Sequence, residues 1–360
     1  MAYTNIDDPS AHFQALTYTG NGSNPRNLTN DGNSDLKPDL IWGKSRGTNI
    51  DHQLYDSSRG FGTSKGLQSN STATESGQTT YGYISASLTD GFTAAAGGTN
   101  GDWFNRNNDP FVAWQWKANG GTTASNTDGN ITSTVQSNQD AGFSIVTYTG
   151  NGSNNQTIGH GLGVQPSWWV VKNRSGGSTN WLVGASSILG GTSNYLKLND
   201  NSANTEYNNI WGDSPTSSTL FRVSNVSHLN TNGSNYVAYL FANKQGYSKF
   251  GSYVGNGSNS GPFIYTGFKP AFVMMKRTDY TGNWVMFDDK RDPSNVVYHR
   301  LFPNLTNAES TSRDYIDLLS NGIKYRGYWP DHNKSGGTYI YMAFAENPFV
   351  TSTGIPTTAR

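Results

Sequence analysis

The sequence contains no cysteine, and only 14% of its 360 residues are charged. Without cysteine, the chain can form no disulfide, use no thiol nucleophile and build no cysteine-ligated zinc site. Lysine plus arginine equals aspartate plus glutamate at 25 each, with no basic cluster, which argues against a surface that neutralises nucleic-acid phosphates. No apolar run approaches the roughly 20 residues of a membrane-spanning helix, and none follows Met1 as a secretory signal would. We therefore expect neither nucleic acid nor a membrane among the partners.

Helical periodicity is nearly absent as well, and Gly, Asn, Ser and Thr dominate the composition. Low charge combined with low hydrophobicity can indicate disorder. Aromatic residues nevertheless make up 13% of the chain, and they gather in short segments typical of strands. The composition therefore predicts an all-β protein whose strands are joined by many polar, glycine-rich loops.

What the chain does contain is a long internal repeat. The segment FSIVTYTGNGSN at 143–154 has a second copy, FQALTYTGNGSN at 13–24, and a shorter third copy, FGSYVGNGSN at 250–259. After each copy comes a proline that is followed six residues later by lysine; these prolines are Pro38, Pro166 and Pro270. Three of the four glutamates then stand at matching places, and they are Glu75, Glu206 and Glu309. Because an aromatic strand also closes each copy, we conclude that the chain is a triplication.

Each copy has about 100 residues, the size of a self-contained β-sandwich. We predict three tandem sandwiches of the jelly-roll or lectin-like type, which we call units 1, 2 and 3. The expected order is an extended arm at 1–12, unit 1 at 13–118, a flexible linker rich in Gly, Ser, Thr and Asn at 119–142, unit 2 at 143–246, unit 3 at 247–348 and a tail at 349–360. The short junction between units 2 and 3 predicts a rigid pair, with unit 1 more independent. At least one of the two chain ends is expected to lie against another chain or the virus particle.

The repeated glutamates are the first candidates for chemistry. A glycosidase needs a second carboxylate about 5–10 Å away, and Asp56 and Asp288 recur at similar places, but unit 2 has Gly184 there. A site without a recurring partner favours a structural glutamate that bonds loop backbone. The six histidines are scattered without metal-ligand spacing. We therefore expect no catalytic residue, no metal site and no cofactor.

Aromatic residues in loops are the second candidates. They stand beside Asn, Asp or Gly, outside the repeated strands, and are Trp103, Trp211, Tyr280 and Trp329. A pyranose ring stacks on an aromatic face while its hydroxyl groups need hydrogen bonds, so these residues are candidates for glycan contact. The alternatives are ordinary loop anchoring or a contact with another protein subunit.

The motifs together resemble a family of virion-associated proteins of marine tailed bacteriophages. The similarity is carried by AYTNIDDPSAHFQ at the start, by GHGLGVQPSWWVVKNR, KQGYSKFGSYVGNGS and GFKPAFVMMKRTDYTGNWVMFD, and by YIYMAFAENPFV near the end. The resemblance implies a structural, tail-fibre-like or lectin-like protein of the virus particle, assembled in the host cytoplasm. It supplies no catalytic residues.

Three functions follow as hypotheses. The first is a tail fibre or receptor-binding protein that contacts host-surface glycans, expected as a homo-oligomer and in particular a homotrimer. The second is a capsid decoration protein that binds other virion proteins, and the third is a glycan-degrading enzyme. An exposed groove of aromatic and Asn residues favours the first, a large apolar contact patch the second, and two facing carboxylates the third.

Overall fold

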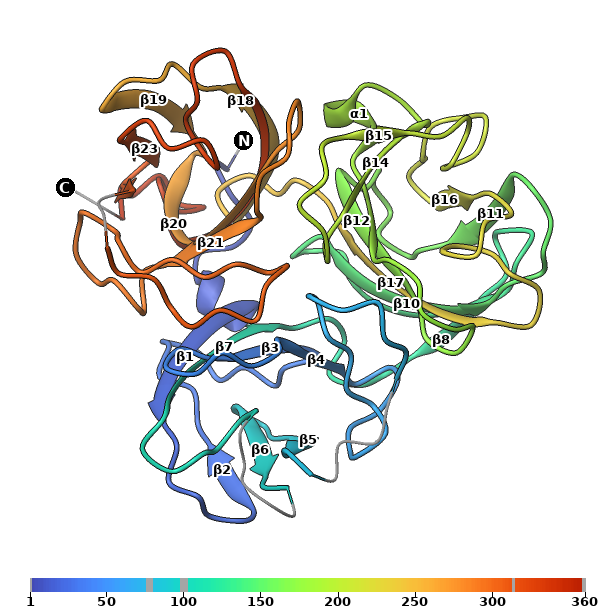
Figure 1. The fold of residues 1–360 in the computed structure, drawn as a ribbon, viewed down its shortest axis with the longest axis horizontal. Coiled ribbons are helices and arrows are strands. Elements are labelled where there is room, and N and C mark those ends of the chain that lie inside the picture. The colour runs from blue at the N-terminus through green and yellow to red at the C-terminus, as the bar shows by residue number, and fades with distance from the viewer. Residues whose placement is uncertain (1, 76–79, 98–102, 313–314, 358–360) are drawn as a thin grey trace.

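The computed structural model describes residues 2–75, 80–97, 103–312 and 315–357, and it is built of antiparallel strands (Figure 1). The helical segments within these ranges are a short 3-10 turn, η1 (Pro9–Ala11), and a four-residue helix, α1 (Ser186–Leu189). The predicted all-β class is therefore confirmed.

Each unit contributes one larger and one smaller sheet. The sheets of unit 1 are, in strand order, β1 (Phe13–Thr19), β7 (Pro110–Trp116), β3 (Leu40–Ser45) and β4 (Gln53–Asp56), and β2 (Arg26–Leu28), β6 (Phe92–Ala95) and β5 (Tyr83–Ser87). Those of unit 3 are β18 (Ser248–Val254), β24 (Thr338–Pro348), β20 (Phe268–Arg277) and β21 (Val285–Asp288), and β19 (Ser260–Tyr265), β23 (Gly322–Arg326) and β22 (Ile316–Leu319).

Unit 2 has the same larger sheet extended at both edges. Its eight strands are, in order, β15 (Thr205–Glu206), β14 (Asn194–Lys197), β13 (Leu182–Gly184), β12 (Trp168–Asn173), β17 (Asn235–Phe241), β10 (Phe143–Thr149), β9 (Ser133–Asn138) and β8 (Ala124–Asn126). Its smaller sheet pairs β11 (Gln156–Gly159) with β16 (Leu220–Val223). The order β10-β17-β12-β13 repeats β1-β7-β3-β4 and β18-β24-β20-β21.

The register of these sheets shows which residues are equivalent. The paired residues in the middle of the three sheets are Leu40 and Trp116, Trp168 and Phe241, and Phe272 and Phe344. Pro38, Pro166 and Pro270 each lie two residues before the first member of these pairs, so the three prolines are equivalent as expected. The third copy of the repeat is not shorter than the others, because β18 begins at Ser248, two residues before its first aromatic residue.

The central strands of each larger sheet are buried on both faces. In β12, for example, the whole segment WWVVKN is buried. Alternate side chains point to opposite faces of a strand, so one set packs against the smaller sheet of the same unit and the other set points to the centre of the molecule. Val171 and Trp169 accordingly belong to the core inside unit 2, whereas Trp168 and Val170 belong to a central core shared by all three units.

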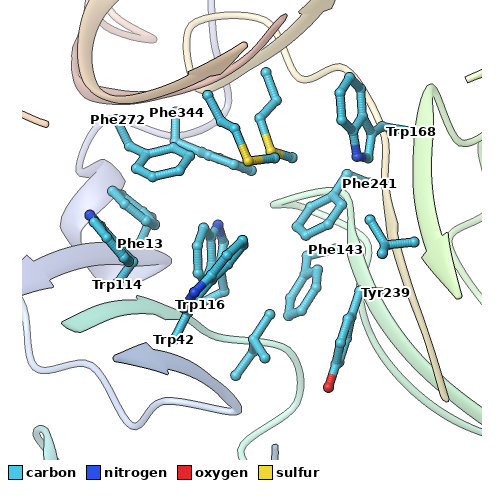
Figure 2. Close-up of a cluster of buried hydrophobic side chains, with 14 of the residues drawn as sticks. Phe13, Trp42, Trp114, Trp116, Phe143, Trp168, Tyr239, Phe241, Phe272 and Phe344 are labelled. Carbon is cyan, nitrogen blue, oxygen red and sulfur yellow. The ribbon is translucent and has the colours of Figure 1, made fainter. Parts of the chain in front are cut away.

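The centre of the molecule is aromatic (Figure 2). The equivalent residues Trp116, Phe241 and Phe344 meet there, with ring centroids 5.6 Å apart between Trp116 and Phe344 and 5.7 Å apart between Phe241 and Phe344. The three units therefore surround one core, as the ribbon shows (Figure 1). Units 2 and 3 pack together here as predicted, but the prediction that unit 1 is more independent was wrong, because unit 1 supplies this core as fully as the others.

Hydrogen bonds close the three units into a ring. At each interface a backbone N–H from one unit donates to a backbone carbonyl of the next; the pairs are Glu75 to Arg174 (3.2 Å), Asn204 to Thr278 (2.8 Å) and Glu309 to Arg46 (2.8 Å). The last of these returns from unit 3 to unit 1. The arrangement thus has approximate threefold symmetry within one chain.

The predicted linker at 119–142 is part of the fold. It contains β8 and β9, and β9 pairs along β10 from Asn138 opposite Phe143 to Ser133 opposite Tyr148. Gln136 of β9 also donates to the hydroxyl oxygens of Ser57 and Ser58 in unit 1, both at 2.9 Å. The composition predicts a flexible linker here, but that prediction was wrong, because the segment pairs as a strand and contacts unit 1.

The described parts of the two chain ends lie against their own chain, so a neighbouring chain is not needed to hold them. In the arm at 1–12, the buried Thr4 donates to the carbonyl of Gln245 at 2.8 Å, and Ile6 joins the central core. In the tail at 349–360, the backbone N–H of Ser352 donates to the carboxylate of Asp7 at 2.6 Å. The arm and the tail therefore anchor each other on unit 3.

Candidate functional site

Two of the four predicted glycan-contact residues are core residues. Trp103 is 6% exposed and belongs to the core inside unit 1. Trp211 is 1% exposed, lies edge-on to Trp169 at 5.3 Å, and donates its indole N–H to the carbonyl of Asn194 at 2.9 Å. Neither ring can stack on a ligand, so the anchoring interpretation holds for both.

The other two lie on adjacent loops of unit 3. Tyr280 is 63% exposed, and Trp329 is half-buried beneath Tyr328. The loops are joined where the backbone N–H of Asn283 donates to the carboxylate of Asp331 at 3.2 Å. This surface presents two exposed tyrosines, Tyr280 and Tyr328.

A pocket suited to a polar ligand lies instead on unit 2, directly beside Trp211. It has a volume of about 550 Å³, and its lining consists of Asn154, Asn155, Tyr207, Asn208, Asn209, Asp213 and Ser224; we call it the amide pocket. Tyr207 is 51% exposed, which leaves its ring available for stacking. One aromatic ring, four amides and a carboxylate thus surround one hollow.

Local turn chemistry holds the walls of the amide pocket. The side-chain oxygen of Asn155 accepts from the backbone N–H of Asp213 at 3.2 Å, and that of Asn154 accepts from the N–H of Asn225 at 3.0 Å. Asn155 and Asn209 have φ of 52° and 53°, the left-handed conformation that Asn tolerates better than most residues. The sequence signal for this pocket is the run EYNNIWGD at 206–213. In it, Tyr207 and two asparagines stand between Glu206 and Trp211, the two residues predicted as candidates.

The repeated GNGSN loops have a structural role. In each unit a buried asparagine donates its amide to the first Asn of the loop and accepts from that residue's backbone N–H; the pairs are Asn105 with Asn21, Asn230 with Asn151 and Asn333 with Asn256. Buried amides of this kind satisfy the polar backbone of a tight turn. The triplicated motif therefore anchors a loop, and only Asn154 of these loops lines the amide pocket.

The three glutamates do not form a site that occurs in all three units, because only Glu75 and Glu309 lie in equivalent ionic clusters. Glu75 accepts from Arg59 of its own unit and Arg174 of unit 2, both at 2.7 Å, and with Asp56 these residues form ionic cluster A. Burial raises the pKa of Glu75, but the two guanidinium groups outweigh it and the pKa is lowered overall.

Ionic cluster B repeats this arrangement between units 3 and 1. Glu309 accepts from Arg291 at 2.8 Å and from Arg46 at 2.7 Å, and Arg291 also contacts Asp288 at 2.6 Å. The exposed Glu206 is not equivalent to the other two glutamates, because Asn204 makes the corresponding backbone bond. The residue of unit 2 equivalent to Asp56 and Asp288 is Ala185, one residue beyond the predicted Gly184.

Two facing carboxyl groups do occur, in a place that no repeat indicated. Asp289 lies next to Glu346, which contacts Lys269, and burial together with Glu346 raises the pKa of Asp289 well above its usual range. Within the described ranges, no group of three or more His, Asp or Glu side chains is placed to hold a metal ion.

The three repeated lysines, Lys44, Lys172 and Lys276, are buried, and Lys172 reaches across a unit interface. Lys172 donates to the carbonyls of Thr72 at 2.8 Å and Thr179 at 2.5 Å, and Lys44 donates to that of Ser45 at 2.6 Å. Burial lowers the pKa of Lys172 to about 7. It also lowers the pKa of Lys44 and of Lys276 to about 8, although nearby carboxylates raise both values in part. Among the described residues, none of the three ammonium groups forms an ion pair with a carboxylate.

We predict that the protein becomes more stable between pH 7 and pH 9. Lysines in the unfolded chain titrate near 10.4, so in this window the unfolded state binds more protons than the folded state and the unfolding free energy rises with pH. The rise should approach about 1.4 kcal/mol per pH unit for each lysine that has lost its proton in the folded state. Urea unfolding at the two pH values measures it, and Lys172→Met should reduce the slope. Equal or lower stability at pH 9 would contradict the prediction.

Comparisons with known proteins place the chain in a family. No curated protein sequence and no solved structure gives a significant match. No helix within the described ranges is long and apolar enough to cross a membrane. A family model described as a domain of unknown function, DUF7483, matches residues 8–348. The match covers all three units as one domain, so the chain belongs to the DUF7483 family.

Proposed function

We propose that this chain is a structural protein of a tailed-phage particle, built from three duplicated β-sandwich units of the jelly-roll or lectin-like type. In its preferred form the protein is a tail fibre or receptor-binding appendage that contacts host-surface glycans. The observation that carries the glycan contact is the amide pocket, where Tyr207 stands beside four asparagines and Asp213. The phage context is supported by the motif resemblance.

The chemistry of the amide pocket suits a sugar. A pyranose presents an apolar face of C–H groups and a rim of hydroxyls that both donate and accept hydrogen bonds. An amide offers both roles in one side chain, and an aspartate accepts two bonds. Tyr207 would take the apolar face, while Asn208, Asn209 and Asp213 would bond the rim. The pocket contains neither a lysine nor an arginine, which favours a neutral glycan over an acidic one.

Binding to neutral polysaccharide from the host cell surface is the expected result in a pull-down or calorimetric assay. Tyr207→Ala should weaken the binding about tenfold, or about 1.4 kcal/mol, because the stacking ring is lost. Asn208→Ala should weaken it by a smaller factor.

Tyr280→Ala is the matched control, since Tyr280 is also an exposed tyrosine but does not line the amide pocket. It should change the affinity by less than twofold. If Tyr280→Ala weakens binding and Tyr207→Ala does not, the glycan function stands but its site is the surface predicted from sequence. Absence of binding by the unaltered protein would overturn the proposal.

A specific observation also supports the second candidate, a capsid decoration protein. Phe263 and Tyr265 of β19 are 46% and 53% exposed on the outer face of unit 3. Two large apolar side chains on an outer sheet face suit contact with another virion protein. A homotrimer is part of both proposals. The contacts of the chain ends with their own chain do not add support for it, and the mass of the purified protein tests it.

A further inference from the structure

Within the part of the chain that the structure describes, no strand pairs with the outer edge of β1, whereas β9 pairs with the edge of its equivalent β10. Strand β1 ends its sheet in the order β1-β7-β3-β4, while β9 continues the sheet beyond β10. Two hydrogen bonds, from the N–H of Lys117 to the carbonyl of His12 and from the N–H of Gly20 to that of Asp109, show that the even-numbered residues of β1 face β7. Antiparallel strands alternate, so the backbone groups of Phe13, Ala15 and Thr17 point away from β7.

Strand β9 shows what fits such an edge. Its Gln136 stands opposite Ile145, the residue of β10 equivalent to Ala15. The Gln136 side chain donates to Ser57 and Ser58 and accepts from the backbone N–H groups of Asn119 (3.2 Å) and Gly121 (2.7 Å). One added strand thus completes the sheet of unit 2 and ties that unit to unit 1.

At the corresponding place beside β1 there is a pocket between units 1 and 3. It has a volume of about 300 Å³, and Phe13 and Ala15 of β1 line one side while Asp289, Lys290 and Glu346 of unit 3 line the other. Asp289 and Lys290 are the equivalents of Ser57 and Ser58, because they follow β21 as those serines follow β4. The pocket is therefore the position that β9 fills at the interface between units 1 and 2.

The lining of this pocket differs from its counterpart in charge. Where Gln136 meets serine hydroxyls and backbone N–H groups, the unit 3 side offers two carboxyl groups, Asp289 and Glu346, and one ammonium group, that of Lys269. Lys269 contacts Glu346, whereas the pKa of Asp289 is raised by burial and by Glu346. Lys290 is turned to Asp31 at 3.0 Å. A positively charged side chain entering here would give Asp289 an ion-pair partner of its own.

We propose that the outer edge of β1 is a docking site for an extended strand of another polypeptide, which pairs antiparallel with β1 and places a Lys or Arg opposite Ala15. The backbone groups of Phe13, Ala15 and Thr17 supply the pairing, and Asp289 and Glu346 select the basic side chain. Strand addition to an open edge is a common mode of protein recognition, since main-chain bonds give affinity and side-chain pockets give specificity. This inference is independent of the glycan site.

The probe is a synthetic peptide that copies residues 130–139, made with Gln136→Lys, and its control carries Gln136→Glu. Fluorescence anisotropy with the full chain should show binding of the Lys peptide and at least tenfold weaker binding of the Glu peptide. Hydrogen exchange should show new protection of the Ala15 and Thr17 amides. Asp289→Asn combined with Glu346→Gln should remove the preference for the Lys peptide.

Ala15→Pro is the backbone variant, because it deletes an N–H that points outward and leaves the bonds to β7 in place. It should abolish peptide binding, and the charge variant above tests the site separately if Ala15→Pro fails to fold. Equal binding of the two peptides, no binding at millimolar concentration, or unchanged protection at Ala15 and Thr17 would overturn the proposal. If Ala15→Pro alone lowers the mass of the assembly, the occupant is a second copy of this chain, and the proposed partner is wrong.

Discussion

Phe344→Ala is expected to lower the unfolding free energy by about 3–5 kcal/mol, the usual cost of truncating a buried aromatic ring. The Phe344 side chain is 1% exposed, and its ring contacts all three units. Its neighbours include Phe13 of unit 1 at 5.4 Å, Phe241 of unit 2 at 5.7 Å and Phe272 of unit 3 at 6.3 Å. The cavity would therefore weaken every interface at once (Figure 2).

Because the core is shared, the whole chain should also lose its structure in one step. Urea unfolding followed by tryptophan fluorescence and by far-ultraviolet circular dichroism should give coincident transitions for the unaltered protein and for the variant. Phe344→Leu, which keeps most of the volume, should cost much less. A separate transition confined to residues 13–118 would contradict the shared core and restore an independent unit 1.

Arg59→Ala is expected to destabilise the protein by about 3–5 kcal/mol, because it leaves a buried carboxylate without its partner. The side chains of Arg59 and Asp56 are both fully buried, and Asp56 also accepts from the hydroxyl of Tyr239 in unit 2 at 2.7 Å. Arg174→Ala is the matched control, since that guanidinium is 17% exposed and solvent can replace its contact with Glu75. Its cost should be about 1 kcal/mol. Chemical denaturation of the two variants measures the difference.

The third interface of the molecule suggests how the loss can be repaired. There the equivalents of Asp56, Arg59 and Tyr239 are Ala185, Ile188 and Met342, and all three pack on the central core. Apolar residues of suitable volume often replace a buried ion pair without loss of stability. The triple variant Asp56→Ala, Arg59→Ile, Tyr239→Met should therefore be more stable than Arg59→Ala alone. If the triple variant is the less stable of the two, the ionic cluster is required for more than filling the interface.

Ionic cluster A also illustrates the limit of sequence comparison. Three glutamates stand at similar sequence distances from the repeated strands, so the sequence predicts that Glu206 is equivalent to Glu75 and Glu309. The structure makes Asn204 the equivalent residue, because the loop of unit 2 forms β14 and β15 and reaches the interface two residues earlier. Loop lengths vary between the units, and only the hydrogen bond to the next unit shows which residues correspond.

Two of the four aromatic candidates are core residues for a related reason. Trp103 and Trp211 lie in loops beside polar residues, which is the local pattern of a ligand-contact residue as well as of an anchor. Whether such a ring points inward depends on the sheet it covers, and here Trp211 covers Trp169 of β12. Tyr207, four residues away, is the ring left exposed.

The sequence alone determined the all-β class, the triplication and the equivalence of the closing strands, because strand periodicity, turn residues and the order of landmarks are local properties of the chain. Only the tertiary structure decided that the units form a ring around Trp116, Phe241 and Phe344, and that residues 119–142 belong to a sheet. It alone brought Asp289 to Glu346 and left the outer edge of β1 without a pairing strand among the described residues. These features depend on contacts between residues far apart in the chain, and such contacts follow from how buried faces pack rather than from local composition.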